Sequence, residues 1–286
     1  MSNTKITSPL VSVQWLAEHL DSENLVILDA SMKPVTLSAT DSLEEDTTCI
    51  QGAMRFDFDN DIRDKNTDLP HMMPSPEFFT EEMQKLGINK TSAIVAYDRV
   101  GVYSSPRAWW MFRAMGHGQV AVLDGGLPAW KKAGFACDTQ PKTSAEHRGN
   151  FIAKPQDGLF CDSADMLAAL SDPGFAVLDA RSNGRFKGTE PEPRAGLRPG
   201  HMPNSINLPY ADVVVDGFIS PRTKLDAIFS NLVKQEQKLI FSCGSGVTAC
   251  ITALAAELAG YSNIAVYDGS WSEWGLPSSG LPVETG

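Results

Sequence analysis

The sequence predicts an α/β protein of two domains, each built on a parallel sheet that carries helices on both faces. Short runs rich in β-branched residues alternate with amphipathic helical patterns, which is the order of strands and crossover helices in such sheets. The chain has 286 residues, and at about 150 residues per domain this length favours two domains. The two halves also repeat each other's strand segments, which indicates a duplicated domain.

Three segments of the first half return in the second half. The matching pairs are residues 26–30 with 176–180, 93–97 with 238–242, and 121–125 with 265–269. The offsets are close to half the chain length, which excludes a solenoid of short repeats. We therefore expect domains at residues 8–138 and 159–286, joined by a linker at residues 139–158 that is polar and lacks periodicity.

The second half shows the expected elements most clearly. Apolar runs predict buried strands at residues 176–178, 239–242 and 264–267. Helical patterns predict one helix over residues 164–170, behind Ser163 as N-cap, and another over residues 249–259, ended by Gly260. Ligands of such sheets bind beyond the carboxyl ends of the strands, so the loop after residue 242 is the first candidate site.

Charge and composition exclude several classes of function. Lys and Arg total 24 and Asp and Glu total 35, which gives a formal net charge of −11, so nucleic acids and anionic membranes are poor partners. No apolar stretch approaches the roughly 18 residues of a membrane span, and residues 1–20 lack the pattern of a targeting peptide. The five cysteines include no Cys-x-x-Cys and the five histidines are isolated. We therefore expect no disulfide scaffold, no metal site and a reducing, cytoplasmic location.

The predicted strand at residues 239–242 leads into the loop Cys243-Gly244-Ser245-Gly246-Val247-Thr248, and a helix follows at once. Backbone N–H groups converge at such a strand–helix junction, and the helix dipole adds positive charge. Glycines permit the tight curvature that this convergence needs. The setting favours a cysteine thiolate at neutral pH, which makes Cys243 the candidate nucleophile.

Three chemistries use a loop of this kind. A cysteine phosphatase needs an arginine six residues after the cysteine, where this chain has Ala249. The spacing Gly244-x-Gly246-x-x-Ala249, with Asp268 downstream, formally matches a dinucleotide fingerprint, but too little chain follows for a full dinucleotide fold. Sulfur transfer needs a nucleophilic cysteine whose persulfide is held by N–H donors, and the loop meets both needs.

The loop from Cys243 to Ala249 resembles the active-site loop of the tandem rhodanese-domain sulfurtransferases that use 3-mercaptopyruvate. The resemblance covers nearly the whole chain. Further matching segments are residues 105–112, 179–181, 184–186, 188–194, 200–203 and 267–274. In the first domain, Asp98 stands in the slot that corresponds to Cys243. The resemblance therefore implies two rhodanese-like domains, of which the first is catalytically silent.

The resemblance also implies the site residues. Catalysis falls to Cys243, Ser245, His71 and an aspartate, which is Asp59 by context, with Asp57 and Asp61 as alternatives. Substrate binding falls to Arg185, Arg194 and the loop residues Gly244, Gly246, Val247 and Thr248. The two arginines would hold the carboxylate and keto oxygens of the donor, because a guanidinium presents a fork of N–H groups.

The same resemblance separates two sulfur donors. Relatives that use thiosulfate carry an arginine and a lysine directly after the cysteine, whereas this chain has Gly244 and Ser245. A neutral loop suits a monoanionic α-keto acid. We therefore expect a monomer, without cofactor or metal, that moves the sulfur of 3-mercaptopyruvate through a Cys243 persulfide to a thiol such as thioredoxin, or to cyanide, and releases pyruvate. The alternatives are a thiosulfate sulfurtransferase of the same fold and a non-catalytic persulfide carrier module.

A few other residues have no role in this scheme. Cys49 and Gln51 stand where relatives have histidine and proline, and His201 keeps that histidine in the second domain; we interpret these positions as structural. Cys250 is interpreted as a packed small hydrophobe. The remaining expectations are a core position for Trp109, Trp110, Trp130, Trp271 and Trp274, and a solvated loop for the acidic tract Asp41, Glu44, Glu45 and Asp46.

Overall fold

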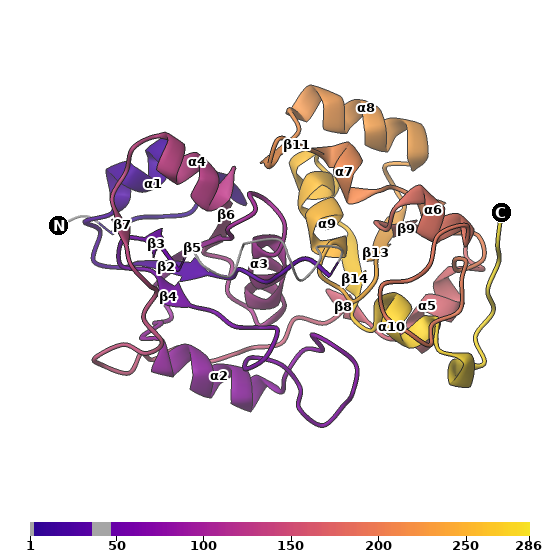
Figure 1. The fold of residues 1–286 in the computed structure, drawn as a ribbon, viewed down its shortest axis with the longest axis horizontal. Coiled ribbons are helices and arrows are strands. Elements are labelled where there is room, and N and C mark those ends of the chain that lie inside the picture. The colour runs from indigo at the N-terminus through magenta and orange to yellow at the C-terminus, as the bar shows by residue number, and fades with distance from the viewer. Residues whose placement is uncertain (1–2, 36–46) are drawn as a thin grey trace. The chain divides into compact units, whose positions relative to one another are not determined.

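The structure, a computed structural model, describes residues 3–35 and 47–286. It divides into two compact units (Figure 1). The first comprises Met1–Asp64, Met73–Gln156 and Asp216–Phe218, and the second comprises Lys65–Met72, Asp157–Val215 and Ile219–Gly286. The acidic tract at residues 41–46 lies outside the described residues.

The first unit is built on a five-stranded sheet whose strands all pair in parallel. Its order is β1 (Leu10–Val11), β6 (Val120–Leu123), β5 (Ala93–Tyr97), β2 (Leu25–Asp29) and β4 (Met54–Arg55). A separate antiparallel pair joins β3 (Cys49–Ile50) to β7 (Cys137–Asp138). The three central strands are the apolar runs of the first half, because strands covered on both faces need continuous apolar sequence.

Helices cover both faces of this sheet. On one face Ile27 and Val95 pack in a cluster with Leu16 of α1 (Val13–His19) and Trp130 of α4 (Gly126–Lys132). On the other face α3 (Ser105–Ala114) lies against β5 and β6. Its Phe112 packs edge-on, with ring centroids 5.3 Å apart, against Phe79 of α2 (Pro76–Lys85).

The second unit repeats this plan. Its parallel sheet has the order β10 (Ile206–Asn207), β9 (Phe175–Asp179), β13 (Lys238–Ser242), β14 (Ile264–Tyr267) and β8 (Phe160–Cys161). Val177 and Ile240 face α5 (Ser163–Ala169) and α10 (Ser270–Trp274). Phe241, the next residue along β13, faces α8 (Arg222–Leu232), where its ring centroid lies 6.4 Å from that of Phe229. α9 (Ala249–Leu258) packs against β13, β14 and α8.

The shorter elements of the second half lie in its connections. They are α6 (Asn183–Lys187), α7 (Tyr210–Val213), the pair β11 (Val214–Val215) and β12 (Phe218–Ile219), and the 3₁₀ turn Pro277–Ser279. In the described part of the chain no helix is long and apolar enough to cross a bilayer. All five cysteines are free thiols.

The expected fold class is confirmed, and most of the expected elements occur where the sequence places them. The strands predicted at residues 176–178, 239–242 and 264–267 lie within β9, β13 and β14. The tryptophans expected in the core are all at most 1% exposed, and Cys250 is fully buried. α9 ends as predicted before Gly260, whose φ of +92° is in the left-handed region.

One helix start was wrong by one residue. α5 begins at Ser163, and Asp162, not Ser163, is its N-cap. The Asp162 carboxylate accepts the N–H groups of Ala164 and Asp165, and the Asp165 carboxylate accepts the N–H of Asp162. This reciprocal capping box satisfies more orphan donors than one hydroxyl can. The Ser163 hydroxyl instead bonds to Glu273 Oε1, at 3.1 Å.

Candidate active site

The candidate site lies at the carboxyl end of β13, where the chain turns through residues 243–248 into α9. The strands β9 and β14 flank β13 in parallel, so the segments that follow all three strands meet at the same edge of the sheet. The segment after β9 contains Arg181, Arg185 and Arg194, and the segment after β14 forms α10. The site is therefore assembled from three connections of one sheet.

The Cys243 side chain is almost completely buried, and its backbone is tied to α10. The Cys243 N–H donates to Ser270 Oγ at 3.2 Å, and the Cys243 carbonyl accepts the N–H of Trp271 at 2.9 Å. The next carbonyl, that of Gly244, accepts both the N–H and the hydroxyl of Ser272, at 2.8 and 2.7 Å. These bonds fix the backbone of Cys243 and Gly244. The tight turn of the loop that follows then shapes the site.

Three residues of the site have left-handed backbone, and one of them is His71, with φ +62°. Gly246 has φ +75°, a conformation that glycine adopts without steric cost. Ser270 has φ +49° although it carries a side chain, and it is fully buried. Such a conformation costs on the order of 1–3 kcal/mol in a non-glycine residue and persists where the surroundings enforce it. The strained residue Ser270 is also the residue whose hydroxyl oxygen accepts the N–H of Cys243.

The equivalent loop of the first unit shows how its N–H groups are directed. Asp98 follows β5 as Cys243 follows β13, and it is fully buried. Its carboxylate accepts six hydrogen bonds of 2.7–3.1 Å, from the N–H groups of Val100, Gly101, Tyr103, Ser104 and Ser105 and from the Ser105 hydroxyl. Burial raises the pKa of the Asp98 carboxyl, and the hydrogen bonds from Ser105 and Tyr103 act against that rise. The first loop is thus an anion cradle that its own side chain occupies.

The two arginines predicted to bind substrate both approach Gly244. Measured to the place where a Cβ on Gly244 would lie, Arg185 Nη2 is 3.1 Å away and Arg194 Nη1 is 3.8 Å away. The glycine therefore lets both guanidinium groups come close to the backbone beside Cys243. A fork of N–H donors in this position can hold a carboxylate.

Arg185 is itself held by a carboxylate that the sequence analysis did not identify. Glu192 Oε2 accepts from Arg185 Nη2 at 2.5 Å and from Nε at 3.2 Å. The other oxygen of Glu192, Oε1, accepts from Arg181 Nη1 at 2.8 Å. The Glu192 side chain is only 3% exposed, so it joins two arginines away from solvent.

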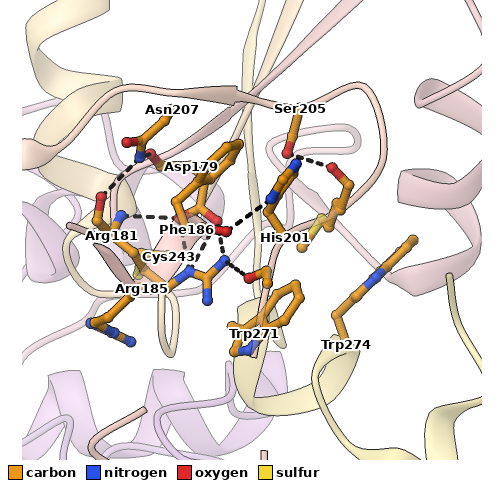
Figure 2. Close-up of polar contacts among 12 residues, drawn as sticks. Asp179, Arg181, Arg185, Phe186, His201, Ser205, Asn207, Cys243, Trp271 and Trp274 are labelled. Atoms are coloured by element: carbon orange, nitrogen blue, oxygen red, sulfur yellow. Dashed lines mark hydrogen bonds and ion pairs between the residues drawn. The ribbon is translucent and has the colours of Figure 1, made fainter. Parts of the chain in front are cut away.

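Arg181 anchors this group of charges. Figure 2 shows its guanidinium beside Asp179, whose carboxylate accepts from Nε and Nη2, and close to the ring of Trp271. The guanidinium carbon lies 4.0 Å from the Trp271 ring centroid, and Nη2 also donates to the carbonyl of Gly200 at 2.9 Å. Burial alone would lower the pKa of Arg181, but Asp179 and Glu192 raise it overall.

Ser245 and His71 are brought together. His71 Nδ1 lies 3.1 Å from the Ser245 hydroxyl oxygen and 3.2 Å from the Ser245 carbonyl oxygen, and both residues are buried. When Nδ1 lacks a proton it accepts the serine O–H, and when it carries one it donates to the carbonyl. The pair can therefore pass a proton between hydroxyl and imidazole.

The predicted aspartate belongs to the first unit. The N–H of Asp59 donates to Asp57 Oδ1 at 3.2 Å, and Asp57 pairs with Arg55 at 3.3 Å. Asp59 also lines a cavity of about 350 Å³ together with Arg55 and Arg99. The partnership of His71 with Asp59, Asp57 or Asp61 stays a prediction.

Of the residues interpreted as structural, Cys49 and His201 are buried, whereas Gln51 is exposed. Cys49 is fully buried, and burial, followed by the charges of Asp138 and Asp29, raises the pKa of its thiol to about 11. His201 stacks on Phe186 with ring centroids 3.8 Å apart, and its Nδ1 lies 2.8 Å from the Phe186 carbonyl oxygen. Across the described ranges, no three histidine, cysteine, aspartate or glutamate side chains gather as metal ligands.

Sequence reasoning missed the roles of four residues. All four, Asp179, Arg181, Glu192 and Ser270, lie within segments that resemble the family. The signal of Glu192 was weak because a charged residue in a Pro- and Gly-rich segment is usually solvated. Only the fold shows that Arg181 and Glu192 are buried against each other.

Comparison with known proteins places this site in a family. Residues 12–133 and 162–276 match the family of rhodanese-like domains. The chain is 37% identical over 280 residues to the 3-mercaptopyruvate sulfurtransferase of Escherichia coli (strain K12), covering 97% of this chain and 98% of that protein. It is 40% identical over 275 residues to the thiosulfate sulfurtransferase of Mus musculus, covering 93% of this chain and 91% of that protein.

A solved structure supports the same assignment. The crystal structure of SseA from Escherichia coli, described as a 3-mercaptopyruvate sulfotransferase with the rhodanese fold, matches with a TM-score of 0.81 at 35% identity. The match covers 93% of this chain and all of SseA. The resemblance inferred from the sequence is thereby confirmed, and the chain belongs to the tandem rhodanese-domain family of sulfurtransferases.

Proposed function

We propose that this sulfurtransferase takes the sulfur of 3-mercaptopyruvate onto Cys243, releases pyruvate, and passes the sulfur to a thiol such as reduced thioredoxin, or to cyanide. The observation that carries the proposal is the pairing of a neutral loop with two arginines. Gly244 and Ser245 bring no charge next to Cys243, and the guanidinium groups of Arg185 and Arg194 approach Gly244. This arrangement fits a donor with one carboxylate at a distance from its sulfur.

In the first half-reaction the Cys243 thiolate attacks the thiol sulfur of the donor. A sulfur–sulfur bond forms, the carbon–sulfur bond breaks, and its electron pair passes to carbon as the enolate of pyruvate. Protonation of that enolate gives pyruvate and leaves Cys243 as a persulfide. Negative charge develops on the keto oxygen, so fixed N–H donors from Arg185 or Arg194 lower the barrier.

Ser245 and His71 supply the proton transfer in this scheme. The imidazole nitrogen lies 3.1 Å from the serine hydroxyl, within the distance at which a general acid–base pair works. We assign Ser245 the protonation of the leaving enolate and His71 the return of the proton. Asp59 is the proposed partner of the imidazole. The loop residues Gly246, Val247 and Thr248 offer backbone N–H groups to the persulfide.

In the second half-reaction an acceptor thiolate attacks the outer sulfur of the persulfide. The sulfur–sulfur bond breaks, and the Cys243 thiolate leaves and is ready for another donor. Because the donor product departs before the acceptor reacts, the kinetics are expected to be ping-pong. No step needs a cofactor.

The second candidate function is thiosulfate sulfur transfer. It is favoured by the 40% identity to the thiosulfate sulfurtransferase of Mus musculus. The absence of a cation at positions 244 and 245 argues against a dianionic donor as the preferred one. Thiosulfate is therefore assigned as a side substrate.

The decisive experiment compares the two donors on the same reduced protein with one thiol acceptor. Pyruvate release reports on 3-mercaptopyruvate, and sulfite release reports on thiosulfate. We expect kcat/KM to favour 3-mercaptopyruvate by 10-fold or more, which is about 1.4 kcal/mol in transition-state binding. A preference for thiosulfate would overturn the assignment of the donor.

Two variants test the covalent step. Cys243→Ser should abolish transfer from both donors, whereas Cys137→Ser, which alters an exposed thiol, should leave both rates unchanged. Pyruvate release that survived Cys243→Ser would contradict the persulfide mechanism. A reducing compartment such as the cytoplasm is the proposed location, because the reaction needs a free Cys243 thiol and the exposed Cys137 is also free.

A further inference from the structure

We propose that Glu192 is a further specificity-determining residue of the site: its carboxylate balances and orients Arg185, so that the site prefers a monoanionic sulfur donor to a dianionic one. This inference deepens the proposed function and rests on it. Glu192 lies outside the loop of residues 243–248, so the inference attributes part of the selection between donors of different charge to a residue beyond that loop.

The first argument is geometric. One oxygen of Glu192 takes two donors of the same guanidinium, Nε and Nη2 of Arg185. The other oxygen is fixed by Arg181 Nη1, and Arg181 is in turn fixed by Asp179, Gly200 and the ring of Trp271. Glu192 is therefore rigid, and through it the plane of Arg185 beside Gly244 is set.

The second argument is the balance of charge. Arg181 and Arg185 contribute two positive charges, and Asp179 and Glu192 contribute two negative charges, all within one connected set of ion pairs. The set is formally neutral although Arg185 lies beside the nucleophile loop. The side chains of Arg181, Asp179 and Glu192 are at most 3% exposed, so solvent screens these charges little.

Selectivity follows from Coulomb's law. When Glu192 no longer balances it, the positive charge of Arg185 attracts a dianion twice as strongly as a monoanion at the same distance. While Glu192 is ionised, that extra attraction is cancelled, and Arg185 acts mainly as an oriented hydrogen-bond donor. Removal of the Glu192 charge should therefore help thiosulfate more than it helps 3-mercaptopyruvate.

The test is the ratio of kcat/KM for 3-mercaptopyruvate to kcat/KM for thiosulfate, measured on one preparation of each variant. The fraction of folded enzyme cancels in this ratio, so partial misfolding does not change it. Glu192→Gln should move the ratio toward thiosulfate by 10-fold or more. Glu192→Asp keeps the charge and should leave the ratio within 2-fold of the starting protein, even where both rates fall.

Glu190→Gln is the matched control. Glu190 lies two residues earlier in the same connection, is exposed, and bonds to the Ser182 hydroxyl rather than to an arginine. The substitution makes the same change in net charge and should leave the ratio within 2-fold. A general effect of protein charge would instead move the ratio in Glu190→Gln and Glu192→Gln alike.

Several outcomes would overturn the inference. They are equal changes for both donors in Glu192→Gln, a shift in Glu192→Asp as large as in Glu192→Gln, or loss of both activities in a Glu192→Gln protein that keeps the melting temperature of the starting protein. The proposed function fails separately, because it is tested by the ratio in the unsubstituted protein. The inference concerns only the change in that ratio.

Discussion

His71 Nδ1 lies 3.1 Å from the hydroxyl oxygen of Ser245, although 174 residues separate the two in the sequence. Ser245 is the second residue after Cys243, and His71 belongs to the short stretch Lys65–Met72 that packs with the second unit. The chain therefore brings an imidazole from its first half to the Cys243 loop of its second half.

The Ser245 hydroxyl should matter more for one donor than for the other. Cleavage of 3-mercaptopyruvate produces an enolate that needs a proton, whereas cleavage of thiosulfate releases sulfite, which needs none at this step. Ser245→Ala is expected to lower kcat for pyruvate release by at least roughly 100-fold, the lower end of the usual general acid–base contribution. Sulfite release should fall by much less. The control is Ser205→Ala, which removes a hydroxyl that bonds to the Met202 carbonyl and should change neither rate. Equal losses for both donors would remove Ser245 from the proton transfer.

Gly244 is expected to be required for its lack of a side chain. A Cβ at this position would lie 3.1 Å from Arg185 Nη2, so Gly244→Ala should displace the guanidinium by a few tenths of an ångström. The expected result is a several-fold rise in KM for 3-mercaptopyruvate, with little change in melting temperature. Gly118→Ala is the control, because a Cβ there meets no atom within 4 Å. A Gly244→Ala protein with unchanged KM would mean that Arg185 does not contact the donor.

We expect activity to require the Ser270 hydroxyl, and not the strained backbone conformation of this residue. Ser270→Ala removes the acceptor of the Cys243 N–H and keeps the strained φ of +49°, whereas Ser270→Gly removes the same acceptor and relieves the strain. Both variants should lose activity to a similar extent, since both free the first peptide group of the loop. In thermal or urea unfolding, the glycine variant should be the more stable by about 1 kcal/mol. Full activity in Ser270→Gly would show that the hydrogen bond is dispensable.

The sequence was sufficient for the fold because its signals are local and repeated. Strands such as β5 and β13 are apolar on both faces, and their recurrence at half the chain length indicates the duplication without any knowledge of long-range contacts. The start of α5 was misplaced by one residue because two neighbouring residues, Asp162 and Ser163, both suit an N-cap, and only Asp162 completes a capping box.

Residues of the candidate site stand out in the sequence where one short segment contains them, or where the family resemblance marks them. Cys243 and its glycines are contiguous, so their pattern is visible in the sequence. Glu192 and Arg181 are separated by 11 residues, and nothing in their spacing indicates that both become buried and paired. Burial of an ion pair depends on the packing of Trp271 and the Gly200 carbonyl around it, which no local pattern records.

The Asp98 loop should lose stability when its carboxylate is made neutral. Six hydrogen-bond donors converge on the two oxygens of Asp98, and an asparagine would present one oxygen and an NH₂ group to the same cradle. Because each buried donor without an acceptor costs about 1–3 kcal/mol, Asp98→Asn is expected to lower the free energy of unfolding by at least about 3 kcal/mol. Hydrogen exchange followed by mass spectrometry should show faster exchange in residues 98–105, while folded protein keeps its sulfurtransferase activity because Cys243 lies in the other unit. Asp21→Asn, at an exposed position, serves as the control. Unchanged exchange in residues 98–105 of Asp98→Asn would mean that the carboxylate is not the anion that holds this loop.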